Sequence, residues 1–323
     1  MKRFCHGALT FAPFLAATTC ISLAQPAIEF RADEARGQMQ IRIGGQEALV
    51  YVFGKDVDLP HFYPVRSPSG KSMTVEQTEP YPHHRSFWFA DTVQLEGQRQ
   101  ASFYNALYSG ADDKKNPKPP FRDHIRQVAF AHQISGNGKA ELDAKLLWEM
   151  DDGKTVVLDE TRHIRIVALG GGEYFLDLQF KLAATYGDVK FCSDAVHYAW
   201  PFIRLNNDFN TTSGGVLVNS EGQTGQTNTN MKLARWVDFS RAGAKDAEGL
   251  AMFSHPANEH PHAWLTRDYG CLGPRRAEAK SGKPFTLEKG ESLETRVGVL
   301  VHQGDVKSGR VAERYEAYVG GKL

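Results

Sequence analysis

Short runs of alternating apolar and polar residues, separated by turn residues, dominate this chain of 323 residues. Strands of this length at this spacing are typical of a sandwich or barrel built from antiparallel hairpins. We therefore predict an all-β fold, an antiparallel β-sandwich with few short helices. The runs predicted as strands are residues 39–43, 48–53, 145–149, 155–158, 161–167, 174–182, 215–218, 250–253 and 293–301. Turn signals fall at residues 44–45, 135–138, 151–153, 170–172, 187–188 and 289–290. Residues 309–318 carry a helical stripe instead.

The first 24 residues have the order expected of a secretory signal peptide. Lys2 and Arg3 supply a short cationic segment, residues 8–23 carry no charge, and residues 22–24 are the small residues that signal peptidase requires. A transmembrane anchor fits less well, because the apolar run is short and is interrupted by Pro13. We expect cleavage at the end of this segment and a periplasmic or secreted mature protein.

Composition limits the partners that the chain can have. The sequence carries 38 Lys and Arg and 38 Asp and Glu, a formal net charge of zero. It has no basic run typical of nucleic-acid binding, and no later segment approaches the roughly twenty apolar residues of a membrane span. We expect no nucleic-acid partner and no integral membrane segment in the mature chain. Residues 25–323 can bury a large core and are predicted to form a single β-sandwich domain. Within them, Cys192 and Cys271 form either a disulfide or two separate buried thiols.

Residues suited to chemistry concentrate in four segments, 62–70, 79–89, 197–204 and 253–270. A flat aromatic ring covers the C–H face of a sugar, while imidazole, guanidinium and carboxylate groups satisfy its hydroxyls. The predicted catalytic residues are His84, Arg85, His197, Tyr198, Arg267 and Tyr269. The predicted substrate-binding residues are Tyr63, Arg66, His83, Trp88, Trp200, Arg204, His255, His262, Trp264 and Asp268. Together they predict a cleft for a polar ring compound on a rigid β scaffold.

Other roles are open to the same residues. His83 and His84 are adjacent, so on a strand they face opposite sides and at most one points into a given cleft. Arg85 can pair with Asp91 or Glu79, and the tryptophans can belong to the core. Imidazoles of His255, His260 and His262, with His83 or His84, are enough to bind zinc or copper. The spacing matches no specific metal motif, so we predict no cofactor and leave calcium or zinc open.

Two motifs, PVRSPSG at residues 64–70 and PHHRSFWF at residues 82–89, resemble those of an exported bacterial family labelled "methane oxygenase PmoA family". The resemblance continues through residues 234–240, 249–256, 264–270 and 290–304. It departs at Ser86, where the family usually has glycine, and at residues 193–197. It implies a supersandwich of the galactose mutarotase-like type, found in sugar epimerases and polysaccharide lyases. A methane monooxygenase subunit is an integral membrane protein, so the label does not describe this chain.

We predict a secreted carbohydrate-active enzyme, a polysaccharide lyase or glycoside hydrolase, that cleaves a glycosidic link. Cleavage proceeds by β-elimination at an acidic or oxidised sugar, or by hydrolysis. Elimination requires a base, a group that stabilises enolate-like charge, and an acid for the leaving oxygen. The candidates are His84 or His197 as base, Arg85 or Arg267 as charge stabiliser, and Tyr198 or Tyr269 as acid. Hydrolysis requires paired carboxylates, which no motif marks. The alternatives are a non-catalytic periplasmic or surface sugar-binding protein, and a sugar epimerase or mutarotase.

Overall fold

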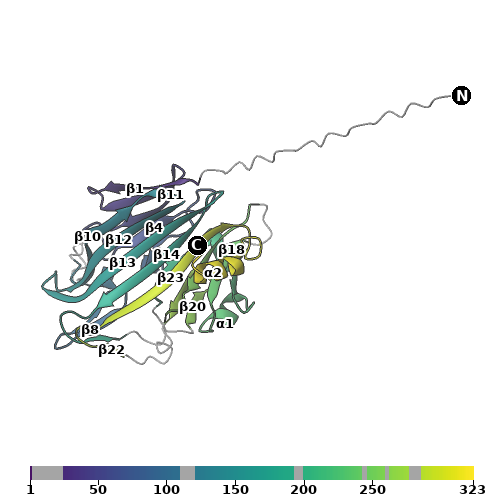
Figure 1. The fold of residues 1–323 in the computed structure, drawn as a ribbon. Helices are drawn as coiled ribbons and strands as arrows, with labels where there is room; N and C mark the ends of the chain where they lie inside the picture. Colours follow the sequence, from purple (N-terminus) through teal and green to yellow (C-terminus); the bar gives the residue numbers. More distant parts are fainter. Residues whose placement is uncertain (2–24, 110–120, 193–198, 242–245, 259–261, 276–284) are drawn as a thin grey trace.

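The computed structural model describes residues 1, 25–109, 121–192, 199–241, 246–258, 262–275 and 285–323. The predicted signal peptide, apart from Met1, lies outside the described residues. The described chain is built mainly from antiparallel strands, which confirms the predicted all-β class. Figure 1 shows the strands in stacked layers, with the C-terminal helix on the outside.

A nine-stranded antiparallel sheet forms one layer. Its order is β11 (Gly136–Asn137), β1 (Ala27–Asp33), β2 (Gln38–Ile43), β3 (Gln46–Val52), β4 (His61–Val65), β7 (Phe87–Trp88), β16 (Phe202–Arg204), β21 (Cys271–Arg275) and β20 (Ala263–Arg267). The last five strands in this order, β4, β7, β16, β21 and β20, are two to five residues long. Loops therefore supply many of the side chains around this part of the sheet.

An eight-stranded sheet forms the second layer, and its long central strands lie side by side in Figure 1. Its order is β10 (His124–Ile134), β12 (Lys139–Met150), β13 (Thr155–Gly170), β14 (Glu173–Ala183), β23 (Ser292–Gln303), β19 (Glu248–Ser254), β18 (Trp236–Arg241) and β17 (Gly215–Asn219). The predicted break between residues 158 and 161 is wrong. Asp159 and Glu160 continue one strand, because they pair with Leu147 and Leu146 of β12.

Smaller elements complete the described chain. A four-stranded sheet has the order β22 (Phe285–Leu287), β15 (Val189–Phe191), β8 (Thr92–Leu95) and β9 (Gln100–Ser102), and a hairpin joins β5 (Glu76–Thr78) to β6 (Tyr81–Arg85). The helices are α1 (Gly225–Thr229), α2 (Val311–Val319) and the short 3-10 turns η1 (Ala106–Tyr108), η2 (Asn207–Phe209) and η3 (Thr211–Ser213). Within these ranges, no helix has the length and apolar character needed to cross a bilayer.

The core lies where the inner faces of the two large sheets meet. Its members include Ile41, Leu49, Tyr51 and Phe62 of the nine-stranded sheet and Leu142, Ile164, Ile166, Leu176 and Leu178 of the eight-stranded sheet. The Arg162 side chain of β13 reaches across the layers and donates to the Pro60 carbonyl at 2.8 Å. A second cluster forms where Val311, Tyr315 and Tyr318 of α2 pack on the other face of the eight-stranded sheet. The predicted helix therefore exists, and its apolar stripe is buried.

Candidate functional site

We call the face of the nine-stranded sheet opposite Phe62, Phe87 and Ile203 its outer face. It collects aromatic and basic side chains, and its Trp88 and Phe202 are themselves buried in the main hydrophobic cluster. Successive residues of a strand point to opposite faces. In β16, Ile203 shares a face with its partner Phe87 of β7, whereas Phe202 and Arg204 point to the other side. Phe202 lies opposite Trp88 of β7, and the two rings are 4.7 Å apart. This outer face therefore carries Trp88, Phe202 and Arg204 close together.

Rings from β6, η1 and the β20–β21 turn pack around these residues. Tyr81 stacks on His84 with 5.1 Å between ring centroids and 21° between planes, and on Tyr269 with 5.6 Å and 29°. His84 also packs on Trp88, at 5.3 Å. We call the whole group the aromatic–histidine cluster, which consists of Tyr81, His83, His84, Trp88, Tyr104, Tyr108, Phe202 and Tyr269.

The position of His84 depends on a sharp change of direction at Ser86. Ser86 has a φ of 71°, in the left-handed region that glycine adopts more readily. Its hydroxyl, fully buried, is hydrogen-bonded to the Phe62 carbonyl and to Oγ1 of Thr74, both at 2.7 Å. Its carbonyl accepts from the Arg204 amide at 2.6 Å. These bonds hold the strained residue in place and connect β6 to the sheet that carries Arg204.

His84 is a buried, neutral imidazole. Its Nε2 lies 3.4 Å from the Tyr104 hydroxyl, and its Nδ1 lies 3.9 Å from Sγ of Cys271. Burial, with the charges of His83 and Arg204, lowers the pKa of His84 to about 3. A base this weak accepts few protons near neutrality. His84 is therefore suited to orienting hydrogen bonds and to presenting its ring face to Tyr81.

The solvent side of the cluster is formed by phenol and imidazole rings. Tyr81 is 38% exposed and Tyr108 is 45% exposed. His83 is half-buried, and its Nδ1 lies 3.3 Å from the Tyr108 hydroxyl. Tyr269 is also half-buried, and burial raises the pKa of its phenol well above the usual range, so the hydroxyl stays protonated. The exposed side thus combines flat ring faces with hydrogen-bonding groups.

Arg204 lies beneath this surface. Its side chain is buried, with its guanidinium carbon 4.3 Å from the centroid of the Tyr269 ring. Nη1 lies 3.6 Å from Sγ of Cys271, and Nε has no hydrogen-bond partner among the described residues. Burial raises the pKa of the Cys271 thiol to about 11, so the thiol is uncharged near neutrality.

Arg85, predicted to stabilise charge on a substrate, forms a buried ion pair instead. Its Nε donates to Oδ1 of Asp58 at 2.7 Å, and both side chains are almost fully buried. Its partner across the β5–β6 hairpin is Glu76, which also accepts from His61 at 2.7 Å. Burial alone would raise the pKa of Glu76, but the hydrogen bond with His61 and the charges of His61 and Arg85 lower it. The neighbouring His84 meets a different set of partners in the aromatic–histidine cluster.

Four other predicted residues are bound into the structure away from the cluster. Trp200 donates to Asp91 at 2.8 Å, and Trp264, fully buried, donates to the Ala234 carbonyl at 2.7 Å. Nδ1 of His262 lies 2.7 Å from the Ser254 hydroxyl. His255 packs against Tyr318 of α2 at 5.2 Å. No described contact joins these four to the cluster.

The remaining predicted residues are mostly engaged in local contacts. Arg66 donates to Glu47 at 2.7 Å, and Tyr63 is half-buried on β4. Arg267 donates to Oδ1 of Asn230 at 2.8 Å, and Asp268 accepts from the Gln226 amide at 3.0 Å. His197 and Tyr198 lie outside the described residues. Of the predicted site residues, the structure brings together His83, His84, Trp88, Arg204 and Tyr269.

The two cysteines are free thiols, with Cys271 buried and Cys192 half-buried. The sequence left open a disulfide or two separate thiols, and the structure shows two separate thiols. The described ranges contain no group of three His, Cys, Asp or Glu residues that could bind a metal ion. His260, part of the metal alternative, lies outside those ranges.

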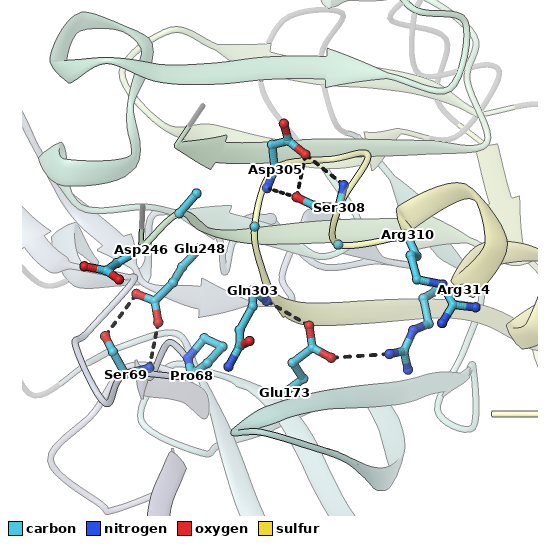
Figure 2. A pocket seen from close by; sticks show the side chains of 13 residues that line it. Pro68, Ser69, Glu173, Asp246, Glu248, Gln303, Asp305, Ser308, Arg310 and Arg314 are labelled. Carbon is cyan, nitrogen blue, oxygen red and sulfur yellow. Dashed lines mark hydrogen bonds and ion pairs between the residues drawn. The ribbon is translucent and has the colours of Figure 1, made fainter. Parts of the chain in front are cut away.

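A polar cavity of about 1140 Å³ lies at a different position, between the end of β23, the start of α2 and the loop that contains Pro68. Figure 2 shows Glu248 with Ser69 on one side and Glu173 with Arg314 on another. Glu248 accepts from the Ser69 amide at 2.6 Å, and Glu173 pairs with Arg314 at 3.3 Å. These carboxylates therefore have partners within the protein. The lining includes no aromatic ring and no predicted site residue, so we take the aromatic–histidine cluster as the candidate site.

Sequence reasoning missed several members of the cluster. Tyr81 belongs to the 79–89 segment that the sequence singled out, and its position two residues before His83 was a usable signal. Tyr104 and Tyr108 carried no motif in the sequence; Tyr108 is the last residue of η1, and Tyr104 lies just before that turn. Cys271, which lies beside Arg204 and His84, was considered only as a disulfide partner or as a separate buried thiol.

Comparisons with known proteins give a family and a fold. A family model described as "Family of unknown function (DUF6807)" matches residues 38–316. No curated protein matches the sequence. The GH36 α-galactosidase AgaB from Geobacillus stearothermophilus is similar in structure, with a TM-score of 0.50 and 10% identity, over 87% of this chain and 42% of that chain. An α-galactosidase from Lactobacillus brevis has a TM-score of 0.47 and 7% identity, over 80% of this chain and 38% of that chain. This chain therefore spans less than half the length of these enzymes, and at 10% identity the likeness to AgaB shows the fold alone.

Proposed function

We propose that this chain, which belongs to the DUF6807 family of unknown function, binds a carbohydrate at the aromatic–histidine cluster. The observation that carries the proposal is the exposed Tyr81 ring, which is stacked on His84 and Tyr269 and flanked by His83. Because packing against its neighbours already fixes the orientation of this ring, it offers a sugar an apolar surface and loses little conformational entropy on binding. Phenol and imidazole groups at its edge can bond the sugar hydroxyls.

The comparison supports this proposal through the fold. AgaB is an α-galactosidase and therefore acts on a sugar, but it shares 10% identity with this chain. Because one fold hosts many functions, the assignment of a sugar to this protein rests on the cluster itself.

We further propose that the bound sugar is cleaved at a glycosidic link. In β-elimination, a base removes a carbon-bound proton, the electron pair forms a C=C bond as the C–O bond breaks, and an acid protonates the leaving oxygen. Tyr269 is suited to be the acid, since its phenol is protonated near neutrality. His84 is a poor base because its pKa is about 3. The half-buried His83 is therefore our candidate for the base.

Hydrolysis is the less favoured route. It requires two carboxylates on opposite sides of the glycosidic bond. Among the described residues, no hydrogen bond or ion pair joins a carboxylate to His84, Arg204 or Tyr269. The groups found at the cluster are imidazoles and phenols, which suit elimination better.

A non-catalytic sugar-binding protein is the second candidate function. The low pKa of His84 favours it, because an imidazole that stays neutral contributes to binding without transferring protons. A sugar epimerase or mutarotase is the third candidate, and it shares the same site.

The test is a panel of acidic and neutral polysaccharides, assayed by absorbance for an unsaturated product and by reducing ends for hydrolysis. Tyr81→Ala should weaken sugar binding by about tenfold, because it removes the stacking surface. The matched control is Tyr186→Ala, since Tyr186 is 43% exposed and bonds Asp159 elsewhere. Loss of turnover in folded His83→Ala with binding kept would support catalysis, whereas unchanged binding in Tyr81→Ala would refute the proposed site.

We also propose that the protein is exported. The order of charge, apolar run and small residues in positions 1–24 supports this. Mass spectrometry of the protein from the producing cell should show a mature chain that starts near Gln25. An intact Met1 on the protein outside the cytoplasm would contradict cleavage.

A further inference from the structure

We infer that Arg204 binds a carboxylate of the sugar, so that the ligand of the aromatic–histidine cluster is an acidic carbohydrate containing uronic acids. The inference rests on the proposed function and assigns a substrate class to the same site. It also moves the charge-binding role from Arg85 and Arg267, the two arginines that the sequence favoured, to Arg204.

Arg204 differs from the buried arginines Arg85 and Arg162 in what surrounds it. Arg85 meets Asp58 at 2.7 Å, and Arg162 is paired with Glu160. Arg204 is only 5% exposed, yet it forms no ion pair with any described carboxylate, and its Nε has no hydrogen-bond partner there.

Among the residues that the structure describes, the neighbours of Arg204 do not supply the missing charge. The Cys271 thiol has its pKa raised to about 11 by burial, and the Tyr269 phenol is held protonated in the same way. His84 is uncharged near neutrality, because burial and nearby cations lower its pKa to about 3. The guanidinium is therefore surrounded by a thiol, a phenol and an imidazole that are all neutral.

A buried charge without a counter-charge is costly, and an arginine cannot avoid the cost by losing its proton. An anionic ligand group that reaches Arg204 would offset this cost. A carboxylate fits because its two oxygens match the guanidinium fork in a planar, bidentate pair. The guanidinium carbon lies over the Tyr269 ring, and Nε, which has no partner among the described residues, is one of the N–H groups that such a pair would use.

The position of Arg204 also suits the chemistry of elimination. The base, for which His83 is the candidate, takes the proton from the carbon next to the carboxyl group of a uronic acid, and the developing charge spreads onto the carboxylate oxygens. A guanidinium at those oxygens stabilises that charge. The electron pair then forms the C=C bond as the C–O bond breaks. Tyr269, in contact with Arg204, is placed to give the leaving oxygen its proton.

The experiment compares ligands that differ by one charge. Binding of galacturonate, glucuronate and mannuronate tetrasaccharides is measured by calorimetry beside their methyl esters, a neutral tetrasaccharide and a sulfated one. We expect the wild type to bind at least one uronate about ten- to a hundredfold more tightly than its ester, as for a charge-assisted hydrogen bond. Arg204→Gln should abolish that preference and keep the weaker binding of the ester.

The matched control is Arg235→Gln. Arg235 also stacks over a tyrosine, Tyr315 at 5.6 Å, but it is exposed and pairs with Glu316. The Arg235→Gln variant should keep the preference for the acid over its ester.

If Arg204→Gln fails to fold, the wild-type comparison of each acid with its ester decides the matter alone. Equal affinity for acid and ester, or a preference for the sulfated sugar, would overturn the carboxylate inference and leave the proposed function standing. Absence of binding to any sugar would overturn the proposed function.

Discussion

Replacing Arg85 with alanine separates two roles that the sequence left open. Arg85 follows His84 directly, so it could either contact the substrate or support the fold. The structure places its Nε 2.7 Å from Oδ1 of Asp58, with side-chain exposures of 3% and 1%. Oδ2 of Asp58 has no partner among the described residues. Arg85→Ala would therefore leave a buried carboxylate without its cation.

The expected cost follows from that geometry. Removal of one partner of a buried ion pair lowers the free energy of unfolding by about 3–5 kcal/mol. For a chain of roughly 300 residues, the entropy of unfolding is about 0.6 kcal/mol per kelvin. The melting temperature should therefore fall by about 5–8 °C. Sugar affinity per folded molecule should stay close to that of the wild type.

Chemical and thermal denaturation measure the stability, and calorimetry below the melting temperature measures the sugar affinity. Arg66→Ala is the control, because Arg66 pairs with Glu47 at the same distance of 2.7 Å, with exposures of 32% and 21%. This pair is partly open to solvent, so its contribution should be close to the roughly 0.2–1 kcal/mol of surface pairs. The double variant of Arg85→Gln with Asp58→Asn should recover part of the lost stability, since no charge is then left unpaired. A folded Arg85→Ala protein of normal stability that no longer binds sugar would refute this reasoning and return Arg85 to the binding site.

Three further predictions concern titration and reactivity. The ring of His84 should show no titration above about pH 4 in an NMR experiment, because burial and neighbouring cations hold its pKa near 3; a midpoint between pH 6 and 7 would contradict this. Burial alone would lower the pKa of His302, but the buried Asp238 carboxylate, 2.9 Å from Nε2, raises it. This pair should stabilise the fold fully below the unfolded pKa of about 6.5 and lose that contribution as pH rises through the higher folded pKa. Urea unfolding should therefore show that the free energy of unfolding falls more between pH 6 and pH 9 in the wild type than in His302→Gln. Equal falls in the two proteins would contradict the pairing. In the chain that starts at Gln25, a thiol reagent should modify the half-buried Cys192 and spare the buried Cys271 until denaturation; equal native reactivity would contradict the burial.

The sequence predicted the strands well where a local pattern was sufficient. Residues 174–182 lie within β14, and residues 293–301 lie within β23, because both alternate over many residues. The helix at residues 309–318 was predicted from its own stripe. Short strands such as β7 and β16 were not predicted, since two or three residues carry no measurable period.

The candidate site was predicted in part. The concentration of His83, His84 and Trp88 in one segment was a signal used for the predicted cleft, and the structure packs these three side chains together. The same reasoning treated His255 and Trp264 as equivalent to them, although both are bound into other parts of the structure. Residue type alone does not distinguish a buried, satisfied side chain from one at a site.

Pattern and composition by themselves determined the all-β class of this protein, because hydrophobic alternation and turn residues are local properties of the chain. The tertiary structure alone decided which arginine is paired. Asp58 and Arg85 are separated by 26 intervening positions, and Arg204 of β16 meets Tyr269 of the β20–β21 turn. Ion pairing and burial depend on distances between segments that are remote in sequence, and those distances are set only when the two sheets and their loops pack together.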